Sequence, residues 1–190
     1  MKTYSIFKSK CSDSERMSDT NFRFMVILFN VFDFLFPMID WRVKKFGIEK
    51  GKTIVDYGCG PERYTARFAK LVGEKSKVYA VDIHELAIET VKTMSARQGL
   101  KNVVPVLAKG YHADIPDHIA DMICAIDMFF IIKDPTSFLC ELKRLAKPDG
   151  ILIIDDCHQR RSTTRKKIEE SGCWEILEAT RDHLKCKPKT

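Results

Sequence analysis

The sequence predicts an α/β protein with a parallel, doubly wound sheet, and two observations carry this prediction. Beyond residue 52, short apolar segments rich in β-branched residues alternate with segments of helical periodicity. Strands that alternate with helices in this way pair in parallel through right-handed crossovers. The length of 190 residues and the apolar content of 45% suit one domain with one core rather than two full domains.

The first two expected strands are short, and each ends in an aspartate. They cover residues 53–56 and 77–82, with a helix expected between them at 62–72. A second helix is expected at 85–98, because its apolar residues share one face and Gly99 supplies the residue that ends a helix in the left-handed conformation.

The second half of the chain continues the alternation. Asp134 and Pro135 supply the N-cap and the first-turn proline of a helix. Residues 147–150, Lys-Pro-Asp-Gly, predict a turn before the most apolar and therefore central strand at 151–154. The remaining expected elements are strands at 103–107 and 121–126, a helix at 162–171 stopped by Gly172, and a terminal hairpin of strands 174–179 and 183–187.

The N-terminal region differs in composition from the rest. Residues 1–20 are polar, and we expect a loose tail followed by a single domain over 21–190. Within that domain we expect a helical lid at 21–50 and a ligand-binding core at 51–190.

The lid contains a strongly apolar run at 24–39 that is too short, and too interrupted by polar residues and Pro37, to span a membrane. Three interpretations remain open. The run is a buried helix, a lid whose aromatic residues wall a small-molecule pocket, or a membrane-surface segment, for which its polar side is thin.

Cysteine content and charge set limits on location and partners. The seven cysteines are an odd number without Cys-x-x-Cys spacing, and no apolar leader precedes residue 20. We therefore expect a reduced, cytoplasmic protein with free thiols and no metal site. The net charge of +6 permits an anionic partner but does not require one.

The loop after the first strand is the best candidate for a ligand site, because ligands of such sheets lie beyond the carboxyl ends of the strands. Gly58 and Gly60 let the backbone approach a ligand closely, and the following helix presents free N–H groups. Asp82, at the end of the second strand, is placed to accept both hydroxyls of a ribose. The pattern indicates a nucleoside-binding domain.

Two residues distinguish between nucleoside ligands. A dinucleotide site needs a third glycine where this chain has Arg63. Asp56 places a negative charge before the loop, which repels a pyrophosphate and suits a ligand with ammonium and sulfonium centres. The residues therefore favour S-adenosylmethionine over a dinucleotide.

Three segments in this order resemble the class I S-adenosylmethionine-dependent methyltransferases, most closely their small type 11, menaquinone-biosynthesis-like branch. They are residues 54–61, 78–82 and 141–150. The resemblance runs from about residue 52 to the C-terminus. It implies a Rossmann-like, seven-stranded sheet with an antiparallel last strand, S-adenosylmethionine as cofactor, and methyl transfer to a small, partly apolar metabolite.

The resemblance also implies residue roles. Asp56, Gly58 and Gly60 would hold the methionyl part, Asp82 the ribose, and Ile83 the adenine. The implied cofactor-binding set is Asp56, Gly58, Cys59, Gly60, Asp82, Ile83, Tyr111, His112, Ile126 and Asp127.

Catalytic residues are not implied, because the sulfonium methyl is already activated and a base is optional. The candidates on the acceptor side are Asp156 and His158, which follow the fifth strand together with Asp155 and Cys157. Their alternative role is to cap that strand.

Departures from the family pattern keep a different function open. Glu62 stands where many relatives have a third glycine, Tyr111 replaces an acidic adenine partner, and Phe130 replaces a common histidine. These three changes allow a catalytically degenerate binding or scaffold protein.

An RNA methyltransferase is the other alternative, since basic residues gather near the last helix at Arg160, Arg161, Arg165, Lys166 and Lys167. Methylation of exocyclic DNA amines is disfavoured, because Asp127-Met-Phe-Phe stands where an Asn-Pro-Pro-aromatic motif is required.

Overall fold

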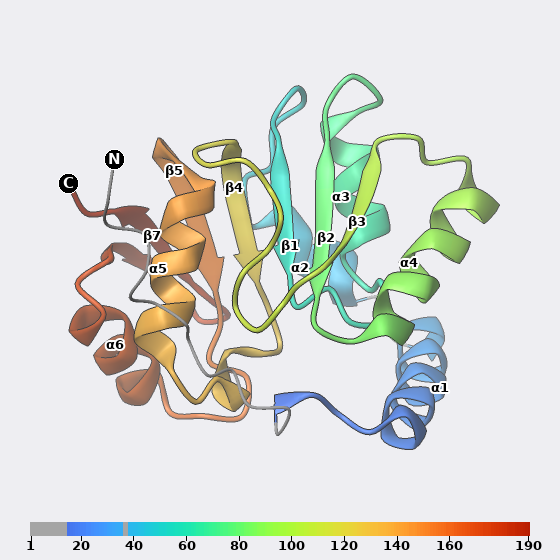
Figure 1. Ribbon diagram of the computed structural model, residues 1–190, viewed down its shortest axis with the longest axis horizontal. Helices are drawn as coiled ribbons and strands as arrows, with labels where there is room; N and C mark the ends of the chain where they lie inside the picture. The colour runs from blue at the N-terminus through green and yellow to red at the C-terminus, as the bar shows by residue number, and fades with distance from the viewer. Residues whose placement is uncertain (1–14, 36–37) are drawn as a thin grey trace.

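The computed structural model describes residues 15–35 and 38–190, and within them the chain forms one seven-stranded sheet in the order β3-β2-β1-β4-β5-β7-β6 (Figure 1). The strands are β1 (Ile54–Tyr57), β2 (Val78–Asp82), β3 (Val103–Leu107), β4 (Ala120–Ala125), β5 (Ala146–Ile154), β6 (Trp174–Ala179) and β7 (Leu184–Pro188). The pairs among β1 to β5 are parallel, and β7 runs antiparallel to both β5 and β6. The predicted doubly wound sheet with an antiparallel last strand is confirmed.

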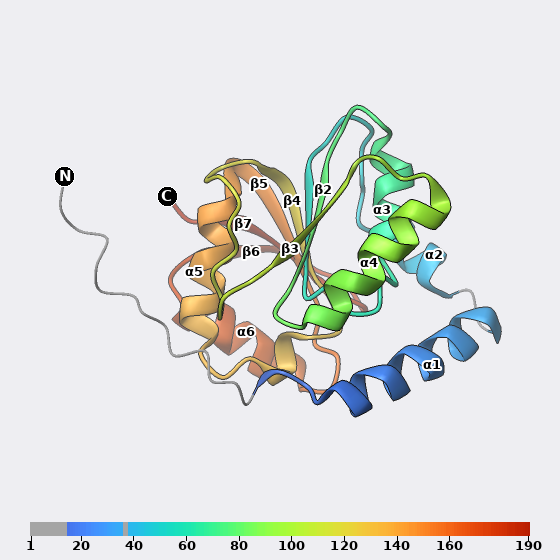
Figure 2. The same ribbon diagram turned by 45° about the vertical axis from the view of Figure 1, so that its right-hand side comes forward.

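Helices cover both faces of this sheet. They are α1 (Asp19–Leu35), α2 (Met38–Lys44), α3 (Thr65–Val72), α4 (Glu85–Gln98), α5 (Pro135–Leu145) and α6 (Arg161–Glu170), with a short 3-10 helix, η2 (Phe129–Ile131). In Figure 2, α5 and α6 lie on one side of the sheet, and α2, α3 and α4 lie on the other. The core is accordingly double, with one apolar cluster on each face.

The alternation of side chains along β1 assigns its residues to these two clusters. Val55 and Tyr57 pack in the cluster beneath α5, whereas Ile54 packs on the opposite face with Phe68 of α3. Successive strand residues point to opposite faces. Asp56 therefore shares the α3 face with Ile54, which decides what its carboxylate can reach.

Two helix boundaries with local signals are confirmed. Gly99 ends α4 in the left-handed conformation with φ 65°. The Asp134 side chain caps α5 by accepting a hydrogen bond from the Ser137 backbone N–H at 3.0 Å, and Pro135 occupies the first turn. These ends depend on neighbouring residues alone, which explains why the sequence predicts them well.

Two other boundaries differ from the prediction. The helix expected from residue 62 begins at Thr65, because Glu62 adopts a left-handed conformation with φ 67° that cannot continue into a right-handed helix. The turn expected at 147–150 lies within β5, as an irregularity between the pairs Ala120–Ala146 and Met122–Ile151.

A close backbone contact explains that irregularity in β5. A Cβ atom at Gly150 would lie 2.8 Å from the carbonyl oxygen of Ala120, so a residue without a side chain is needed there. The Lys147 Nζ contacts the Asp121 carboxylate at 2.8 Å. Together these contacts keep the expected turn residues against β4.

The cysteines depart from the expectation of free thiols. A disulfide joins Cys140 on α5 to Cys173, directly before β6. Cys59, Cys124 and Cys186 are buried thiols and Cys157 is an exposed one, while Cys11 lies outside the described residues. The bonded cysteines are 33 residues apart in sequence, so only the docking of α5 beside β6 brings them together.

The N-terminal segment contacts the domain from its first described residue. Glu15 accepts hydrogen bonds from the Tyr111 hydroxyl at 2.6 Å and from the Lys133 backbone N–H at 2.9 Å. Arg16 contacts Glu85 at 2.9 Å. Residues 1–14 of the expected tail lie outside the described part of the chain.

The first helix is not the fully buried element that its composition allowed. Phe22 of α1 is buried, but Phe24, Ile27, Leu28 and Val31 are exposed. The interpretation as a helix buried in the core is therefore wrong for one whole side of α1. Among the described residues, no helix is both long and apolar enough to span a membrane.

Phe138 of α5 offers a test of the larger core cluster. Its ring is fully buried and contacts Tyr57, Tyr111 and Phe129 at centroid distances of 5.4, 5.7 and 5.9 Å. We expect Phe138→Ala to lower the free energy of unfolding by about 3–5 kcal/mol in urea denaturation. The same change at exposed Phe24 should alter it by less than about 0.5 kcal/mol. Equal effects of the two changes would contradict the described core.

Candidate functional site

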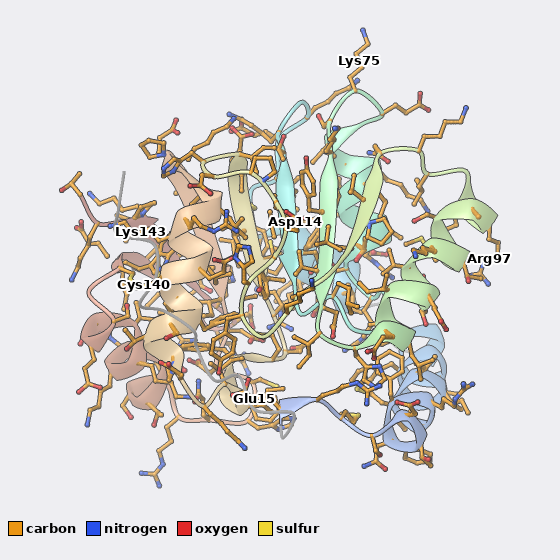
Figure 3. All side chains as sticks on the ribbon, in the orientation of Figure 1. Glu15, Lys75, Arg97, Asp114, Cys140 and Lys143 are labelled. Atoms are coloured by element: carbon orange, nitrogen blue, oxygen red, sulfur yellow. A yellow bond between two sulfur atoms is a disulfide. The ribbon has the colours of Figure 1, made fainter. Side chains whose placement is uncertain are left out.

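A cavity of about 520 Å³ lies beyond the carboxyl ends of the parallel strands. It is bounded by the loops that follow β1 to β5 and by the N-terminal segment. Figure 3 shows Glu15, one of its lining residues, at this edge of the sheet, and Lys75 at the opposite edge. The cavity therefore occupies the place that the sheet topology predicts for a ligand.

The loop after β1 is folded back against β2. The backbone N–H groups of Gly58 and Cys59 both donate to the Val81 carbonyl oxygen, at 2.8 and 3.0 Å. Gly58 has φ 78°, and a Cβ atom there would lie 2.8 Å from Cγ of Met128. A larger residue would therefore strain the backbone and push Met128 from its place in the cavity wall.

Asp82 holds both this loop and the start of α4. One carboxylate oxygen accepts a hydrogen bond from the Gly60 backbone N–H at 2.9 Å, and the other accepts from the His84 N–H at 2.9 Å. Burial raises the pKa of Asp82, and the backbone donors oppose that rise. The carboxylate also lines the cavity, where it can accept hydrogen bonds from a ligand.

Asp56 does not reach this cavity, contrary to the role that the sequence suggests for it. Its carboxylate is buried and accepts a hydrogen bond from the Thr65 hydroxyl at 2.6 Å. Burial raises the pKa of Asp56 to about 7, against the opposing effect of that hydrogen bond, and the nearby Asp82 and Asp127 add to the rise. The direct charge effect on a ligand that we expected from Asp56 is therefore not provided at this position.

The residues after β3 divide between the cavity and the solvent. Tyr111 lines the cavity, and its hydroxyl donates to Glu15 and accepts from the Asp134 backbone N–H at 3.1 Å. His112 instead turns outward toward Glu141, and its side chain is 63% exposed. The structure thus brings Tyr111, but not His112, to the candidate site.

Asp127 places a negatively charged carboxylate at the wall of the first cavity. It has φ 61° and follows Ile126, the residue after β4, and its carboxylate contacts Arg42 at 2.9 Å and Arg63 at 3.4 Å. The Tyr64 hydroxyl also donates to it, at 3.0 Å. Burial alone would raise the pKa of Asp127, but Arg42 and these hydrogen bonds hold it below its usual value.

Arg42 of α2 is a residue of this edge that the sequence did not indicate. Its guanidinium also contacts Asp155, whose second oxygen accepts a hydrogen bond from the Asp127 backbone N–H at 3.0 Å. Burial and the neighbouring Asp127 raise the pKa of Asp155 to about 7. Arg42 therefore ties the N-terminal region to the ends of β4 and β5.

The remaining candidates lie on two sides of this ionic cluster. A second cavity of about 460 Å³ is lined by Arg42, Asp155 and Asp156, and the wall between the cavities includes Cys157. Asp156 is paired with Arg161 on α6. His158 lines the first cavity and contacts the Phe130 ring at a centroid distance of 4.9 Å. The two proposed catalytic candidates thus face different cavities.

The structure brings most of the expected cofactor set together. The members that line the first cavity are Gly58, Cys59, Gly60, Asp82, Ile83, Tyr111, Ile126 and Asp127. Lining residues that sequence analysis did not single out include Glu15, Met17, Phe22, Met25 and Phe29. The apolar run indicated Met25 and Phe29, but it does not show which side of the helix faces a ligand. The other three residues precede the run. Among the described residues, no cluster of three potential metal ligands occurs.

Known methyltransferases are similar to this chain in sequence. A family model described as a methyltransferase domain matches residues 48–185. The demethylmenaquinone methyltransferase of Geobacillus stearothermophilus is 27% identical over 124 residues, which cover 64% of this chain and 53% of that protein. The ubiquinone/menaquinone biosynthesis C-methyltransferase UbiE of Shewanella sp. strain ANA-3 is 25% identical over 138 residues, 72% of this chain and 55% of that protein. The chain thus spans about half the length of these relatives.

A solved structure shows the same arrangement. A SAM dependent methyltransferase from Aquifex aeolicus superposes with a TM-score of 0.69 at 28% identity, covering 78% of this chain and 86% of that chain. The match to the family model begins before β1 and extends into β7, so it includes the loop after β1 that bounds the first cavity.

The buried Asp56 carboxylate makes stability depend on pH. In the folded chain its pKa is about 7, compared with an ordinary value of 3.8, so folding favours the protonated form. The contribution of Asp56 is therefore least unfavourable at low pH, and it becomes more unfavourable as the pH rises from about 4 to 7. We expect Asp56→Asn to gain about 2–3 kcal/mol over the unchanged protein between pH 5 and pH 8 in urea unfolding. A constant difference across that range would show that Asp56 is ionised in the fold.

Glu62 tests the strain in the loop before α3. It has φ 67°, burial raises the pKa of its carboxyl to about 7, and one carboxylate oxygen has no hydrogen-bond partner among the described residues. Glu62→Ala removes the carboxyl and keeps the strain, whereas Glu62→Gly removes both. We expect the glycine variant to be more stable than the alanine variant by about 1 kcal/mol in urea unfolding at pH 7. Greater stability of the alanine variant would contradict the left-handed conformation.

Proposed function

This chain belongs to the methyltransferase-domain family, and from that premise we propose that it transfers a methyl group from S-adenosylmethionine to a small, partly apolar acceptor. The observation that carries the proposal is a single cavity that joins the clamped glycine loop and Asp82 to an apolar wall from the N-terminal helix. A volume of about 520 Å³ is within the range of small-molecule sites.

The residues present fit the cofactor. Gly60 lines the cavity beside open space, since the nearest atom to a Cβ there would be the Gly58 carbonyl oxygen at 4.0 Å, and Asp82 presents a carboxylate to the same cavity. We assign Asp82 to the ribose hydroxyls, the backbone of Gly58 and Gly60 to the methionyl part, and Ile83 to the adenine. Bound S-adenosylmethionine supplies a methyl group on a positively charged sulfur.

Asp127 takes over the electrostatic role first expected of Asp56. It lines the cavity, and its lowered pKa keeps it negatively charged near neutral pH. A fixed negative charge favours a ligand with ammonium and sulfonium centres over one with a pyrophosphate. Arg42, Arg63 and Tyr64 hold this carboxylate in place, and Arg63 and Tyr64 line the same cavity.

The apolar wall of the cavity would exclude water and position the acceptor. Phe22, Met25 and Phe29 of α1 line the cavity on one side, and Phe130 and Ile131 line it on another. Such a wall excludes water and holds an apolar acceptor against the methyl donor, and positioning of this kind can supply roughly 7–11 kcal/mol of the barrier. We therefore keep the division into a lid at 21–50 and a cofactor-binding core at 51–190 as part of the proposal.

The acceptor class rests on the relatives. One is named a demethylmenaquinone methyltransferase and another a ubiquinone/menaquinone biosynthesis C-methyltransferase, and the lining of this cavity suits an aromatic ring with apolar substituents. His158 lies on the acceptor side and is the better candidate for a base if the acceptor loses a proton, since Asp156 faces the other cavity. The cytoplasmic location remains a prediction.

The two alternatives lose their motivation in this structure. The basic cluster considered for RNA is largely engaged, because Arg161 pairs with Asp156, and Arg165 and Lys166 lie near Glu169 and Glu170. Of the residues that suggested a degenerate site, Tyr111 and Phe130 form cavity walls and Glu62 lies outside the lining. None of them lies within 4 Å of the Cβ position at Gly60, which lines the cavity.

Calorimetric titration with S-adenosylmethionine and S-adenosylhomocysteine tests the cofactor site. We expect Asp82→Ala to weaken both affinities roughly 10- to 100-fold, because hydrogen bonds to a charged partner are lost. Asp149→Ala removes an exposed carboxylate near the start of β5, at the other edge of the sheet, and should leave both affinities unchanged. Unaltered binding by a folded Asp82→Ala variant would show that the ribose assignment is wrong.

A further inference from the structure

The outer side of α1 carries a continuous apolar row. Phe24, Ile27, Leu28 and Val31 follow the spacing of one helix face and are 68%, 63%, 53% and 53% exposed. In Figure 2, α1 lies along the margin of the molecule, and no other described element covers its outer side. A row of this size on a helix that contacts solvent marks an interaction surface.

The opposite side of the same helix is apolar as well. Phe22 stacks on His84 at a centroid distance of 4.4 Å, and Phe29 lies beneath the Arg63 guanidinium at 4.2 Å. These side chains, with Met25, wall the first cavity. The polar strip of α1 is therefore thin because the helix has two apolar sides with different neighbours. A helix of this kind needs an apolar partner on each side.

The mouth of the cavity continues the exposed apolar surface. Met17 precedes α1 and Ile131 lies in η2, and both line the cavity while remaining partly exposed to solvent. An apolar molecule that approaches this edge can pass from the surface into the cavity between apolar side chains. The outer row and the cavity thus belong to one edge of the molecule.

The size of the row argues against a second copy of the chain as the partner. Complete burial of the four side chains would remove on the order of 400 Å² of surface per copy, or about 800 Å² in a symmetric pair. Stable protein–protein interfaces bury about 1,200–2,000 Å². An interfacial helix in a bilayer needs only one apolar side, with insertion of a few bulky residues.

Charge favours a bilayer with anionic headgroups. The chain has a net charge of +6, and exposed cations occur at this edge, with Arg23 on α1, Lys133 after η2 and Arg160 after β5. Asp19 and Glu85, near the start of α1 and α4, share one cation, because Arg16 contacts both carboxylates and offsets one of their two negative charges. Lysine and arginine near an anionic surface add to the binding of an amphipathic helix.

We propose that the outer row of α1, with the adjoining cavity mouth, docks on an anionic lipid bilayer and admits a lipid-dissolved acceptor to the cavity. The acceptor part rests on the proposed function, whereas the docking part rests on α1 itself. Because the helix inserts its outer side and keeps its inner side on the cavity, an apolar acceptor can move from lipid to the site without crossing water.

Co-sedimentation of the full chain with vesicles tests the docking. Vesicles of phosphatidylcholine and phosphatidylglycerol in a 3:1 ratio are compared with pure phosphatidylcholine. We expect binding to the anionic vesicles and weaker binding to the neutral ones. Ile27→Gln with Leu28→Gln should lower the partition coefficient about tenfold or more, because two inserting side chains become polar.

A matched control makes the same change elsewhere. Leu71→Gln with Leu177→Gln alters two side chains of similar exposure on α3 and β6, and should leave the partition coefficient unchanged. Neither double variant should change the affinity for S-adenosylmethionine, since Ile27 and Leu28 point away from the cavity. Cofactor binding without vesicle binding would overturn the docking and leave the proposed function intact. Vesicle binding without cofactor binding would support the docking and defeat the function.

Three other outcomes would overturn the docking proposal. One is equal loss of vesicle binding in both double variants, which would mean that general surface polarity controls it. Another is equal binding to neutral and anionic vesicles, which would remove the role of headgroup charge. The third is a dimer in light scattering that Ile27→Gln with Leu28→Gln dissociates, because the row would then belong to a second copy.

Discussion

The Asp82 carboxylate, at the end of β2, is the contact on which the arrangement of the candidate site depends. It accepts one hydrogen bond from Gly60 and one from His84, and so it fixes the loop after β1 and the start of α4 together. Both donors are backbone groups that would otherwise lack partners at the sheet edge. One side chain thus builds the cradle and still faces the cavity. This double use explains why an acidic residue is needed there even before any ligand binds.

The alternation of side chains along β1, together with the turn after β4, determines where the charged groups lie at this end of the sheet. Asp56 is an even step from Ile54, so its side chain enters the α3 face and loses contact with solvent and cavity. Asp127 lies beyond the end of β4, where the chain turns with φ 61° and directs the carboxylate toward Arg42 and Arg63. The buried acid is driven toward its neutral form, and the paired acid is kept charged. The site therefore retains a single well-supported negative group near the β4 end.

Local signals in the sequence predict the structure correctly where neighbouring residues alone decide it. Gly99 and the Asp134-Pro135 pair fix helix ends through their own backbone conformations, and the ends of α4 and the start of α5 were predicted correctly. The sequence does not predict a conformation or contact that depends on a residue far away in the chain. The Ala120 carbonyl oxygen leaves no room for a side chain at Gly150. Cys140 contacts Cys173 only after α5 has docked. Arg42 and Asp127 are 85 residues apart in sequence. No periodicity or short motif contains such contacts, so the sequence could supply the sheet and the glycine loop but not the ionic cluster beside them.

The prediction that α1 is a buried helix was wrong for a different reason: it assumed that a surface helix has only one apolar side. A helix on the surface of a globular domain normally has one apolar stripe, and an even distribution of apolar residues then suggests burial. In α1, Phe22 and Phe29 contact groups at the cavity while Phe24 and Ile27 point outward, so the helix is apolar on two sides without being in the core. Two apolar sides suit a helix that lies between an apolar cavity and an apolar environment. A polar outer side would raise the free-energy barrier for an apolar molecule that moves between them. The composition of α1 is thus explained by the two environments that it divides.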